Sequence, residues 1–347
     1  MKQLLTDYNI EELKQLFPSQ PAFRAKQIFK WLHNGTDIAD MSDISQNFRE
    51  ELSQKYTAIP LKIFKVLSSK KDNTKKFLYQ LNDGGIIEGV VMEYKYGSTI
   101  CISTQIGCRM GCSFCASGIG GLVRNLSAGE ILGQVLAVNS YLGGTIANRK
   151  ITNIVLMGSG EPLDNYLNVT KFLALVSNPE GINISQRNIS LSTCGLSDNI
   201  IRLADDGFKI TLTISLHSAI DEVRKRLMPI SNKYKVSDIV NAAKYYFDKT
   251  GRRVIYEYAL ISGENMDNEA IEALVRITRG YSCHVNLIML NYVKEKGLKP
   301  CTREQAKAFL NELIKRNVSV TIRRSMGSDI EGACGQLRNK VIKEQKL

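Results

Sequence analysis

Three cysteines, Cys108, Cys112 and Cys115, lie within the eight-residue stretch Cys-Arg-Met-Gly-Cys-Ser-Phe-Cys. Three thiolates on so short a loop can converge on one metal centre. Structural zinc sites need four ligands, commonly in two separated pairs, and this sequence has no second pair of cysteines two residues apart. A four-iron cluster explains three thiolates better, because it leaves one iron open for a ligand that is not protein. A zinc-stabilised RNA-binding module without catalytic chemistry is the alternative.

The cysteine loop follows the first strand of a repeating pattern that spans residues 98–330. Six strands are each followed by a helix and one more strand closes the run; they read TICIS, ITNIVLM, NISLST, KITLTISL, RVIYEYALI, CHVNLIML and VSVTIRR. This alternation predicts a parallel sheet with right-handed crossovers. The run approaches a TIM barrel in length but has six repeats in place of eight. We therefore expect an α/β fold with a partial (βα)6 TIM-like barrel, and a doubly wound sheet is the alternative.

Two segments precede this barrel and a tail follows it. Residues 1–57 carry apolar residues at helical spacing and predict an N-terminal helical accessory domain. Residues 58–97 predict a β-hairpin extension, in which KKFLYQL and IIEGVVMEY flank a glycine turn. Residues 331–347 form a C-terminal tail. Within the first segment, AFRAKQIFKWLHNG mixes basic and aromatic residues, as an RNA-facing helix would. The alternative places its aromatic residues in a small core and its lysines in water.

Composition limits the class of protein and of partner. The 347-residue chain has a net charge of +12 and a pI near 9.2, which favours a polyanionic partner, with nucleic acid first. A basic enzyme without such a partner is the alternative. No run approaches the length of apolar sequence needed to cross a membrane, and the N-terminus lacks a signal peptide's apolar core. We therefore expect a cytoplasmic protein whose eight cysteines serve metal binding or catalysis rather than disulfides.

Several polar groups are predicted to lie at the carboxyl ends of the barrel strands, where such folds keep their active sites. The second strand ends in Met-Gly-Ser-Gly-Glu-Pro-Leu, which includes Gly160 and Glu161. Its glycines allow the backbone to approach a ligand closely. Ser192 ends the third strand, and the triplet Ser215, Leu216 and His217 ends the fourth. Each is more often a hydrogen-bonded loop residue, but together they describe the rim of one pocket.

The cysteine spacing, with an aromatic residue before the last cysteine, resembles the radical S-adenosylmethionine superfamily. There the open iron of a 4Fe-4S cluster binds S-adenosyl-L-methionine, and an electron from the cluster releases a 5′-deoxyadenosyl radical. The segments CISTQIGCRMGCSFC, GLVRNLSAGEILGQV, MGSGEPL, SLH, RLMPI and ACGQLR occur in that order. This set resembles the bacterial RNA adenine C2-methyltransferases, which modify 23S rRNA and certain tRNAs. A related antibiotic-resistance enzyme methylates C8 of the same rRNA adenosine and is the alternative.

The resemblance implies roles for three residues outside the cluster loop. Adenine C2 is electrophilic, so these enzymes first methylate a cysteine, which matches Cys334 in the glycine-rich segment GACGQ. A second cofactor molecule supplies the radical that takes hydrogen from the S-methyl group, and the resulting methylene radical adds to adenine. A second cysteine, matching Cys101, resolves the adduct by forming a disulfide with Cys334. Glu88 matches the family's proposed proton acceptor, and a partly desolvated carboxylate could serve that purpose. A small buried hydrophobe is the alternative for Cys101.

The resemblance also implies which residues contact the cofactor, which are Gly160, Glu161, Ser192, Ser215, Leu216, His217 and Asn291. The sequence departs from the family in two places. Ser159 stands where methionine is usual, and Leu-Asn-Tyr around Asn291 replaces Trp-Asn-Pro, which weakens the assignment of Asn291. Pro162 favours the C2 enzyme over the C8 enzyme. We further expect an electron donor such as flavodoxin, no membrane association and a monomer. No role follows for His33 or His284, and we expect Cys194, Cys283 and Cys301 to be packing or surface residues.

Overall fold

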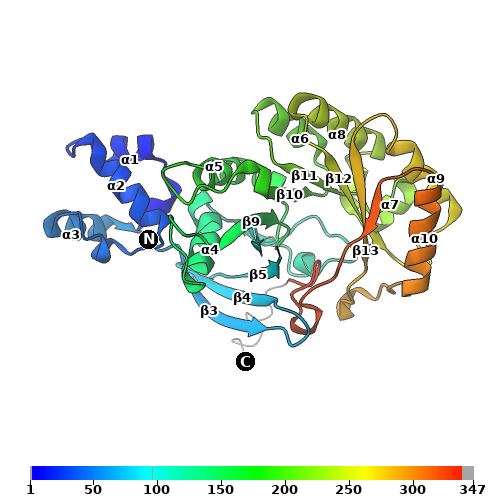
Figure 1. Ribbon diagram of the computed structural model, residues 1–347, viewed down its shortest axis with the longest axis horizontal. Coiled ribbons are helices and arrows are strands. Elements are labelled where there is room, and N and C mark those ends of the chain that lie inside the picture. The colour runs from blue at the N-terminus through cyan, green and yellow to red at the C-terminus, as the bar shows by residue number, and fades with distance from the viewer. Residues whose placement is uncertain (1, 96, 338–347) are drawn as a thin grey trace.

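The computed structural model describes residues 2–95 and 97–337 of the chain. The part of the predicted tail from residue 338 onward therefore lies outside the described residues. One ten-stranded sheet forms the centre of the molecule (Figure 1), with the strand order β14-β13-β12-β11-β10-β9-β6-β5-β4-β3. Its strands are β3 (Leu61–Ser68), β4 (Lys75–Leu81), β5 (Ile86–Tyr94), β6 (Gly97–Cys101), β9 (Ile151–Leu156), β10 (Ile189–Thr193), β11 (Thr211–Ser215), β12 (Val254–Leu260), β13 (Cys283–Met289) and β14 (Val320–Ile322).

The strands from β6 to β14 pair in parallel and in the order of the chain. A doubly wound sheet would reverse its strand order at a switch point, and this part of the sheet does not. The prediction of a partial barrel is thus confirmed. The helices that follow these strands are α4 (Ala128–Tyr141), α5 (Tyr166–Val176), α6 (Ser197–Asp205), α7 (Asp221–Leu227), α8 (Val236–Thr250), α9 (Asn268–Ile277) and α10 (Arg303–Lys315).

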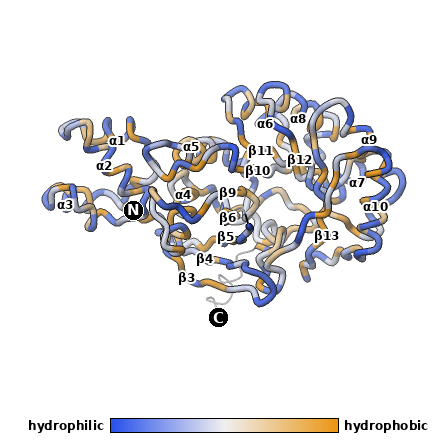
Figure 2. Tube along the Cα trace, viewed as in Figure 1, coloured by the Kyte–Doolittle hydropathy of each residue, from blue (hydrophilic) through white to orange (hydrophobic). Residues whose placement is uncertain are grey.

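Capping residues and amphipathic faces in the sequence explain where the helices begin and how they pack. Helix α4 starts with a capping box, in which the Ser127 hydroxyl accepts from the Glu130 N–H at 3.2 Å and the Glu130 carboxylate accepts from the Ser127 N–H at 2.9 Å. Along the outer helices α8 and α10, hydrophobic and hydrophilic stretches alternate (Figure 2), because one side of each helix packs on the core. Among the described residues, no helix is long and apolar enough to span a membrane.

Strands β3, β4 and β5 are antiparallel and extend the parallel sheet through β6. The predicted hairpin strands are β4 and β5, joined by the glycine turn. The structure adds β3, and the three strands continue the main sheet. A register shift between Ile63 and Lys65 interrupts the pairing of β3 with β4.

The N-terminal segment is helical, as expected. Its helices are α1 (Ile10–Leu16), α2 (Ala22–His33) and α3 (Gln46–Lys55), and it also contains a short parallel pair, β1 (Gln3–Leu4) with β2 (Tyr56–Thr57). The aromatic residues of α2 divide between core and surface. Phe29 is buried, Phe23 is exposed, and the Trp31 indole N–H donates to the Asp43 carboxylate. The interior of these helices is continuous with the barrel core.

Candidate active site

The carboxyl ends of the parallel strands surround a cavity that opens to solvent, with about 1000 Å³ of empty space when the open part is counted. It gathers predicted residues from six separate parts of the sequence. They are Cys108, Cys112 and Cys115 from the cysteine loop, Gly160 and Glu161 after β9, Ser192 on β10, Ser215 and His217 at the end of β11, Asn291 after β13, and Cys334 from the C-terminal segment. The convergence follows from the fold, because parallel strands end at the same edge of their sheet.

The cysteine loop leaves strand β7 (Gln105–Gly107) and returns in β8 (Leu122–Asn125), which pair with each other. Gly107 has φ 78°, and a Cβ atom there would lie 1.9 Å from the Gly121 carbonyl oxygen, so only glycine fits. The Cys108 N–H donates to that same carbonyl at 3.0 Å. On the far side of the loop, the Lys296 ammonium donates to the Cys112 carbonyl at 3.1 Å. The backbone of the loop is thus held at Cys108 and at Cys112.

The three thiols suit an iron–sulfur cluster. Burial raises the pKa of Cys108 to about 12 and raises the pKa of Cys112 further, and the neighbouring thiols act in the same direction. Such thiols become thiolates only when a metal centre compensates their charge. Within residues 2–95 and 97–337, no three His, Cys, Asp or Glu side chains gather closely enough for a single metal ion. The thiols instead line the wall of a wider cavity, which has room for a larger centre.

Glu161 is buried, and its carboxylate joins the ends of two strands. One oxygen accepts from the Leu163 N–H at 3.0 Å and the other from the Cys194 N–H at 2.7 Å. Its own N–H donates to the Gln105 side chain at 2.8 Å. Burial raises the pKa of Glu161, and the hydrogen bonds that it accepts oppose that rise. The carboxylate therefore shapes the cavity wall, because both of its oxygens already have partners in the protein.

At the end of β11, the cavity is lined by Ser215 and by His217, whose backbone conformation is uncommon. The Ser215 and Ser192 hydroxyls lie 3.3 Å apart across neighbouring strands. His217 has φ 56°, which is uncommon for a residue with a side chain. Its Nδ1 accepts from the Ala259 N–H at 2.9 Å, and burial lowers the pKa of His217 to about 3, so the ring is neutral.

The side chain of Leu216 lies away from the cavity. Successive side chains of a strand point to opposite faces, and Leu216 is fully buried in the core and does not line the cavity. Its carbonyl accepts from Arg224, a residue that the sequence analysis did not single out.

Arg224 is fully buried behind this wall. Its guanidinium donates to the carbonyls of Leu216 at 3.0 Å and Cys194 at 2.6 Å, and to the Ser231 hydroxyl at 2.6 Å. It thereby ties together the ends of β10 and β11. Its only signal in the sequence is its place in the basic run Asp-Glu-Val-Arg-Lys-Arg-Leu, which is typical of an exposed helix face.

Cys101 and Cys334 share the wall of a second, adjoining cavity. Cys101 is buried on β6, whereas Cys334 is exposed, and both thiols are free. Burial raises the pKa of Cys101 to about 12, to which the nearby Cys334 thiol contributes and against which the Arg323 guanidinium acts. Arg323 lines both cavities and pairs with the buried Glu257 at 3.4 Å. Neither of these charged residues was singled out from the sequence, although Glu257 interrupts an apolar strand.

Asn291 holds the backbone of the segment that carries Cys334. Its amide donates to the Cys334 carbonyl at 3.1 Å, and its side-chain oxygen accepts from the Ser325 hydroxyl at 2.9 Å. Glu88 lies on β5 and lines neither cavity. It is buried, and its carboxylate pairs with Lys76 at 3.0 Å.

The remaining cysteines are buried. Cys283 and Cys301 pack in the core, as expected, but Cys194 also lines the main cavity and hydrogen-bonds both Glu161 and Arg224 through its backbone.

Comparisons with known proteins agree with this arrangement. Residues 102–275 match the radical SAM superfamily, and residues 4–58 match the ribosomal RNA large subunit methyltransferase N-terminal domain. The chain is 51% identical to the probable dual-specificity RNA methyltransferase RlmN of Clostridium perfringens (strain 13 / Type A), over 100% of this chain and 99% of that protein. It is 49% identical to the protein of the same name in Clostridium acetobutylicum, over 99% of each chain. A crystal structure of a radical SAM methyltransferase from Sphaerobacter thermophilus superposes with a TM-score of 0.92 at 38% identity, covering 97% of this chain and 99% of that one.

Proposed function

Because this chain belongs to the RlmN family of radical S-adenosylmethionine RNA methyltransferases, we propose that it methylates C2 of an adenosine in 23S rRNA and in some tRNAs. The single observation that carries this proposal is the meeting of three groups around one cavity. These are the three-cysteine loop, the Gly-Glu-Pro segment after β9, and Cys334 from the other end of the chain. A zinc-stabilised binding module would have no use for a free thiol beside its metal.

As a member of the superfamily, the enzyme uses a 4Fe-4S cluster and S-adenosylmethionine. We propose that Cys108, Cys112 and Cys115 hold the cluster. When bound, the cluster and its cofactor supply a radical able to remove hydrogen from an unactivated methyl group. In the proposal, the cofactor lies in the main cavity between Gly160, Ser192, Ser215, His217 and Asn291.

Glu161 and Leu216 have structural roles in this proposal. Glu161 lines the cavity and also fixes the position of its wall, because both of its oxygens accept hydrogen bonds from backbone N–H groups. Leu216 contributes packing and its carbonyl, rather than a side-chain contact.

Cys334 is the proposed carrier of the methyl group. Its place on the walls of both cavities supports this role, since the thiol must meet first a methyl donor and then the adenine. Cys101 is the proposed resolving thiol. As it bonds to the Cys334 sulfur, the bond between that sulfur and the methyl carbon breaks. The electron pair leaves with the carbon, which takes up a proton, and the two cysteines become a disulfide.

Glu88 is the proposed acceptor of the C2 proton. Its side chain is on the same face of the sheet as Val90, which packs against Cys101. A buried carboxylate on the same face of the sheet as the resolving thiol supports this role, because proton removal must precede release of the product.

The proposal extends to the partners of the enzyme. The helices of residues 10–55 serve RNA binding, as the match to the N-terminal domain of rRNA methyltransferases supports. We propose that the enzyme acts as a monomer in the cytoplasm, with a flavodoxin or similar protein as electron donor.

The position of the methyl group is the direct test. The enzyme is reconstituted anaerobically and incubated with 23S rRNA or total tRNA, and the nucleosides are separated against 2-methyladenosine and 8-methyladenosine standards. We expect 2-methyladenosine from both RNAs. Recovery of 8-methyladenosine would replace C2 by C8, the alternative that uses the same residues, and unmodified RNA with an intact cluster would overturn the proposal.

A further inference from the structure

The buried ion pair between Lys76 and Glu88 connects to the segment that carries Cys334. The Lys76 ammonium lies 3.0 Å from the Glu88 carboxylate, and the two side chains are 5% and 6% exposed. Removing two charges from water is costly, so a pair of this kind is weak support for stability alone. The other contacts of Lys76 therefore indicate what the pair does.

The register of the sheet places Lys76 on the face of the two reactive thiols. Lys76 on β4 is opposite Val90 on β5, and Val90 is opposite Cys101 on β6. Residues that are directly opposite in antiparallel strands share a face, and Glu88, two residues before Val90, shares it as well. Val90, Cys101 and Leu337 pack together on this face, which brings it against the C-terminal segment.

Lys76 also contacts that segment directly. Its ammonium donates to the Glu331 carbonyl at 3.2 Å, three residues before Cys334. Glu331 has φ 50°, so this carbonyl belongs to a tight left-handed turn. One ammonium group thus touches both the carboxylate and the turn from which the Cys334 segment begins.

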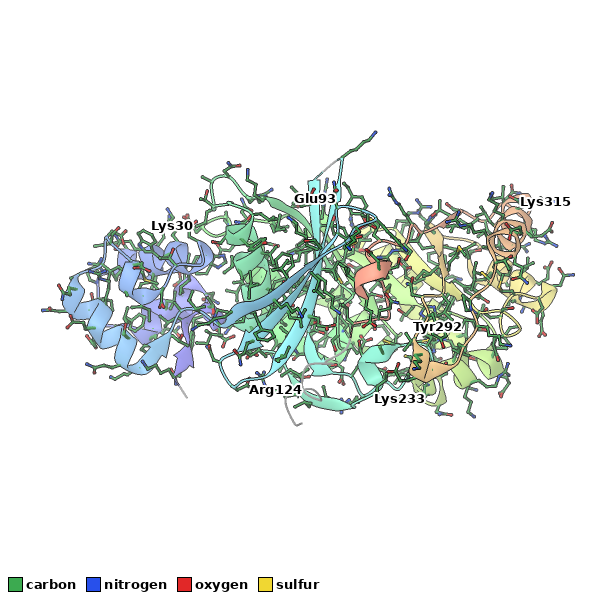
Figure 3. The ribbon with its side chains drawn as sticks, turned by 90° about the horizontal axis from the view of Figure 1, so that it is seen from below. Lys30, Glu93, Arg124, Lys233, Tyr292 and Lys315 are labelled. Atoms are coloured by element: carbon green, nitrogen blue, oxygen red, sulfur yellow. The ribbon has the colours of Figure 1, made fainter. Side chains whose placement is uncertain are left out.

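The loop between β3 and β4 also forms hydrogen bonds with residues 327–329, which precede this turn. The Ser69 hydroxyl and the Lys70 N–H donate to the Asp329 carboxylate at 2.7 and 2.8 Å, and the Gly327 N–H donates to the Asp72 carboxylate at 3.1 Å. The short helix η8 (Ser328–Ile330) accordingly lies beside the end of this hairpin in both views (Figures 1 and 3). Lys76 is the innermost of these contacts and the one that reaches Glu88.

We propose that Lys76 is a positioning residue that sets the Glu88 carboxylate and the Cys334 segment in register for proton removal from the RNA adduct. This inference rests on the proposed function and deepens it. The ammonium contacts both the carboxylate and the Glu331 carbonyl, and it thereby holds the carboxylate close to the segment on which the adduct forms. Lys76 itself exchanges neither a proton nor an electron.

The test compares Lys76→Met with Lys75→Met. Lys75 is the next residue on β4, is partly exposed and is on the opposite face, so it is a control matched in residue type and strand. Both variants are reconstituted and assayed for iron content, for cleavage of S-adenosylmethionine, for methylated RNA, and for RNA covalently attached to the protein after denaturation.

We expect Lys76→Met to keep its iron and its cofactor cleavage but to form product roughly 100-fold more slowly, the lower range for loss of a positioned base. Attached RNA should accumulate, because the adduct forms and is not resolved. Lys75→Met should match the wild type in every assay. A Lys76→Met variant that forms product at the wild-type rate, or that is slow without attached RNA, would overturn the inference.

A second comparison keeps the inference testable if loss of the ammonium beside the buried carboxylate prevents Lys76→Met from folding. Lys76→Met combined with Glu88→Gln removes both charges of the pair, and it is compared with Glu88→Gln alone. Equal rates of product formation support the inference, because Lys76 then acts only through Glu88. A further 100-fold loss in the double variant would overturn it. If the wild type itself forms no 2-methyladenosine, the proposed function fails, and this failure is separate from any result with Lys76.

Discussion

His33 should make the attachment of the N-terminal helices depend on pH. The side chain ends α2 and is only 2% exposed, and its ring packs on Phe29 with centroids 4.1 Å apart. Its Nδ1 accepts from the Ile182 N–H of the barrel at 3.2 Å. Gly181 makes room for the ring, because a Cβ atom there would lie 2.4 Å from Nδ1. Protonation of Nδ1 would break the hydrogen bond and place an unpaired charge between the helices and the barrel.

The size of the effect follows from the pKa. Burial lowers the pKa of His33 from 6.5 to about 3. Between these values the unfolded chain binds a proton that the folded chain does not, so stability is complete above pH 6.5 and falls as the pH falls toward 3. The slope is about 1.4 kcal/mol per pH unit for one group, which gives a loss of about 2 kcal/mol at pH 5. His217 shifts in the same direction and adds a similar slope.

Urea unfolding at pH 7 and pH 5 tests this, followed by the fluorescence of Trp31, the one tryptophan in the sequence and a neighbour on the same helix. The comparison is with His33→Asn, whose amide oxygen can replace Nδ1 as an acceptor but does not titrate. We expect the variant to be less stable at pH 7, because it loses the contact with Phe29. Its further loss at pH 5 should be smaller than that of the wild type by about 2 kcal/mol. Equal losses in the two proteins would refute the reasoning.

Three further substitutions test the walls of the cavity. Arg224→Met leaves two carbonyls and a hydroxyl without their buried donor, and should lower the free energy of unfolding in urea by at least about 1–3 kcal/mol, the cost of one unsatisfied buried group. Arg224→Lys should recover part of this, and a loss below ~1 kcal/mol contradicts the assigned contacts. Glu161→Gln replaces one acceptor oxygen by an NH2 group, a donor that faces a backbone N–H, and should cost about 1–3 kcal/mol in the same assay. Unchanged stability would show that the carboxylate does not hold both strand ends. Gly107→Ala forces a Cβ atom against a carbonyl oxygen, so the reconstituted variant should bind less iron than the wild type, and Gly84→Ala, a glycine with positive φ and open space around it, serves as the control.

The sequence predicted the cavity well because its residues share one topological property. Ser192, Ser215 and His217 each end a strand of a parallel sheet, and strand ends can be recognised from apolar runs. The structure brings them together for that reason alone. Glu161 could be placed in the same way, but its hydrogen bonds could not, because they depend on how closely β9 and β10 approach each other.

What sequence reasoning missed depends on tertiary contacts. Strand β3 escaped notice because the irregularity between Ile63 and Lys65 breaks the period of two that identifies a strand. Arg224 and Lys76 lie in runs of charged residues that resemble solvated surfaces, yet both are buried. Their burial is set by contacts with other elements of the fold, namely the strand ends for Arg224, and Glu88 and Glu331 for Lys76.

The central claim is that the methyl group reaches adenine C2 by way of Cys334. The most direct measurement uses S-adenosylmethionine with a trideuterated methyl group and analyses the methyladenosine of the product RNA by mass spectrometry. A methyl group that loses one hydrogen atom while it is on Cys334, and regains one from water on release, keeps two of its three deuterium atoms. We predict 2-methyladenosine with that label, and none from a Cys334→Ala variant. A fully trideuterated methyl group, or labelled product from the variant, would contradict the account.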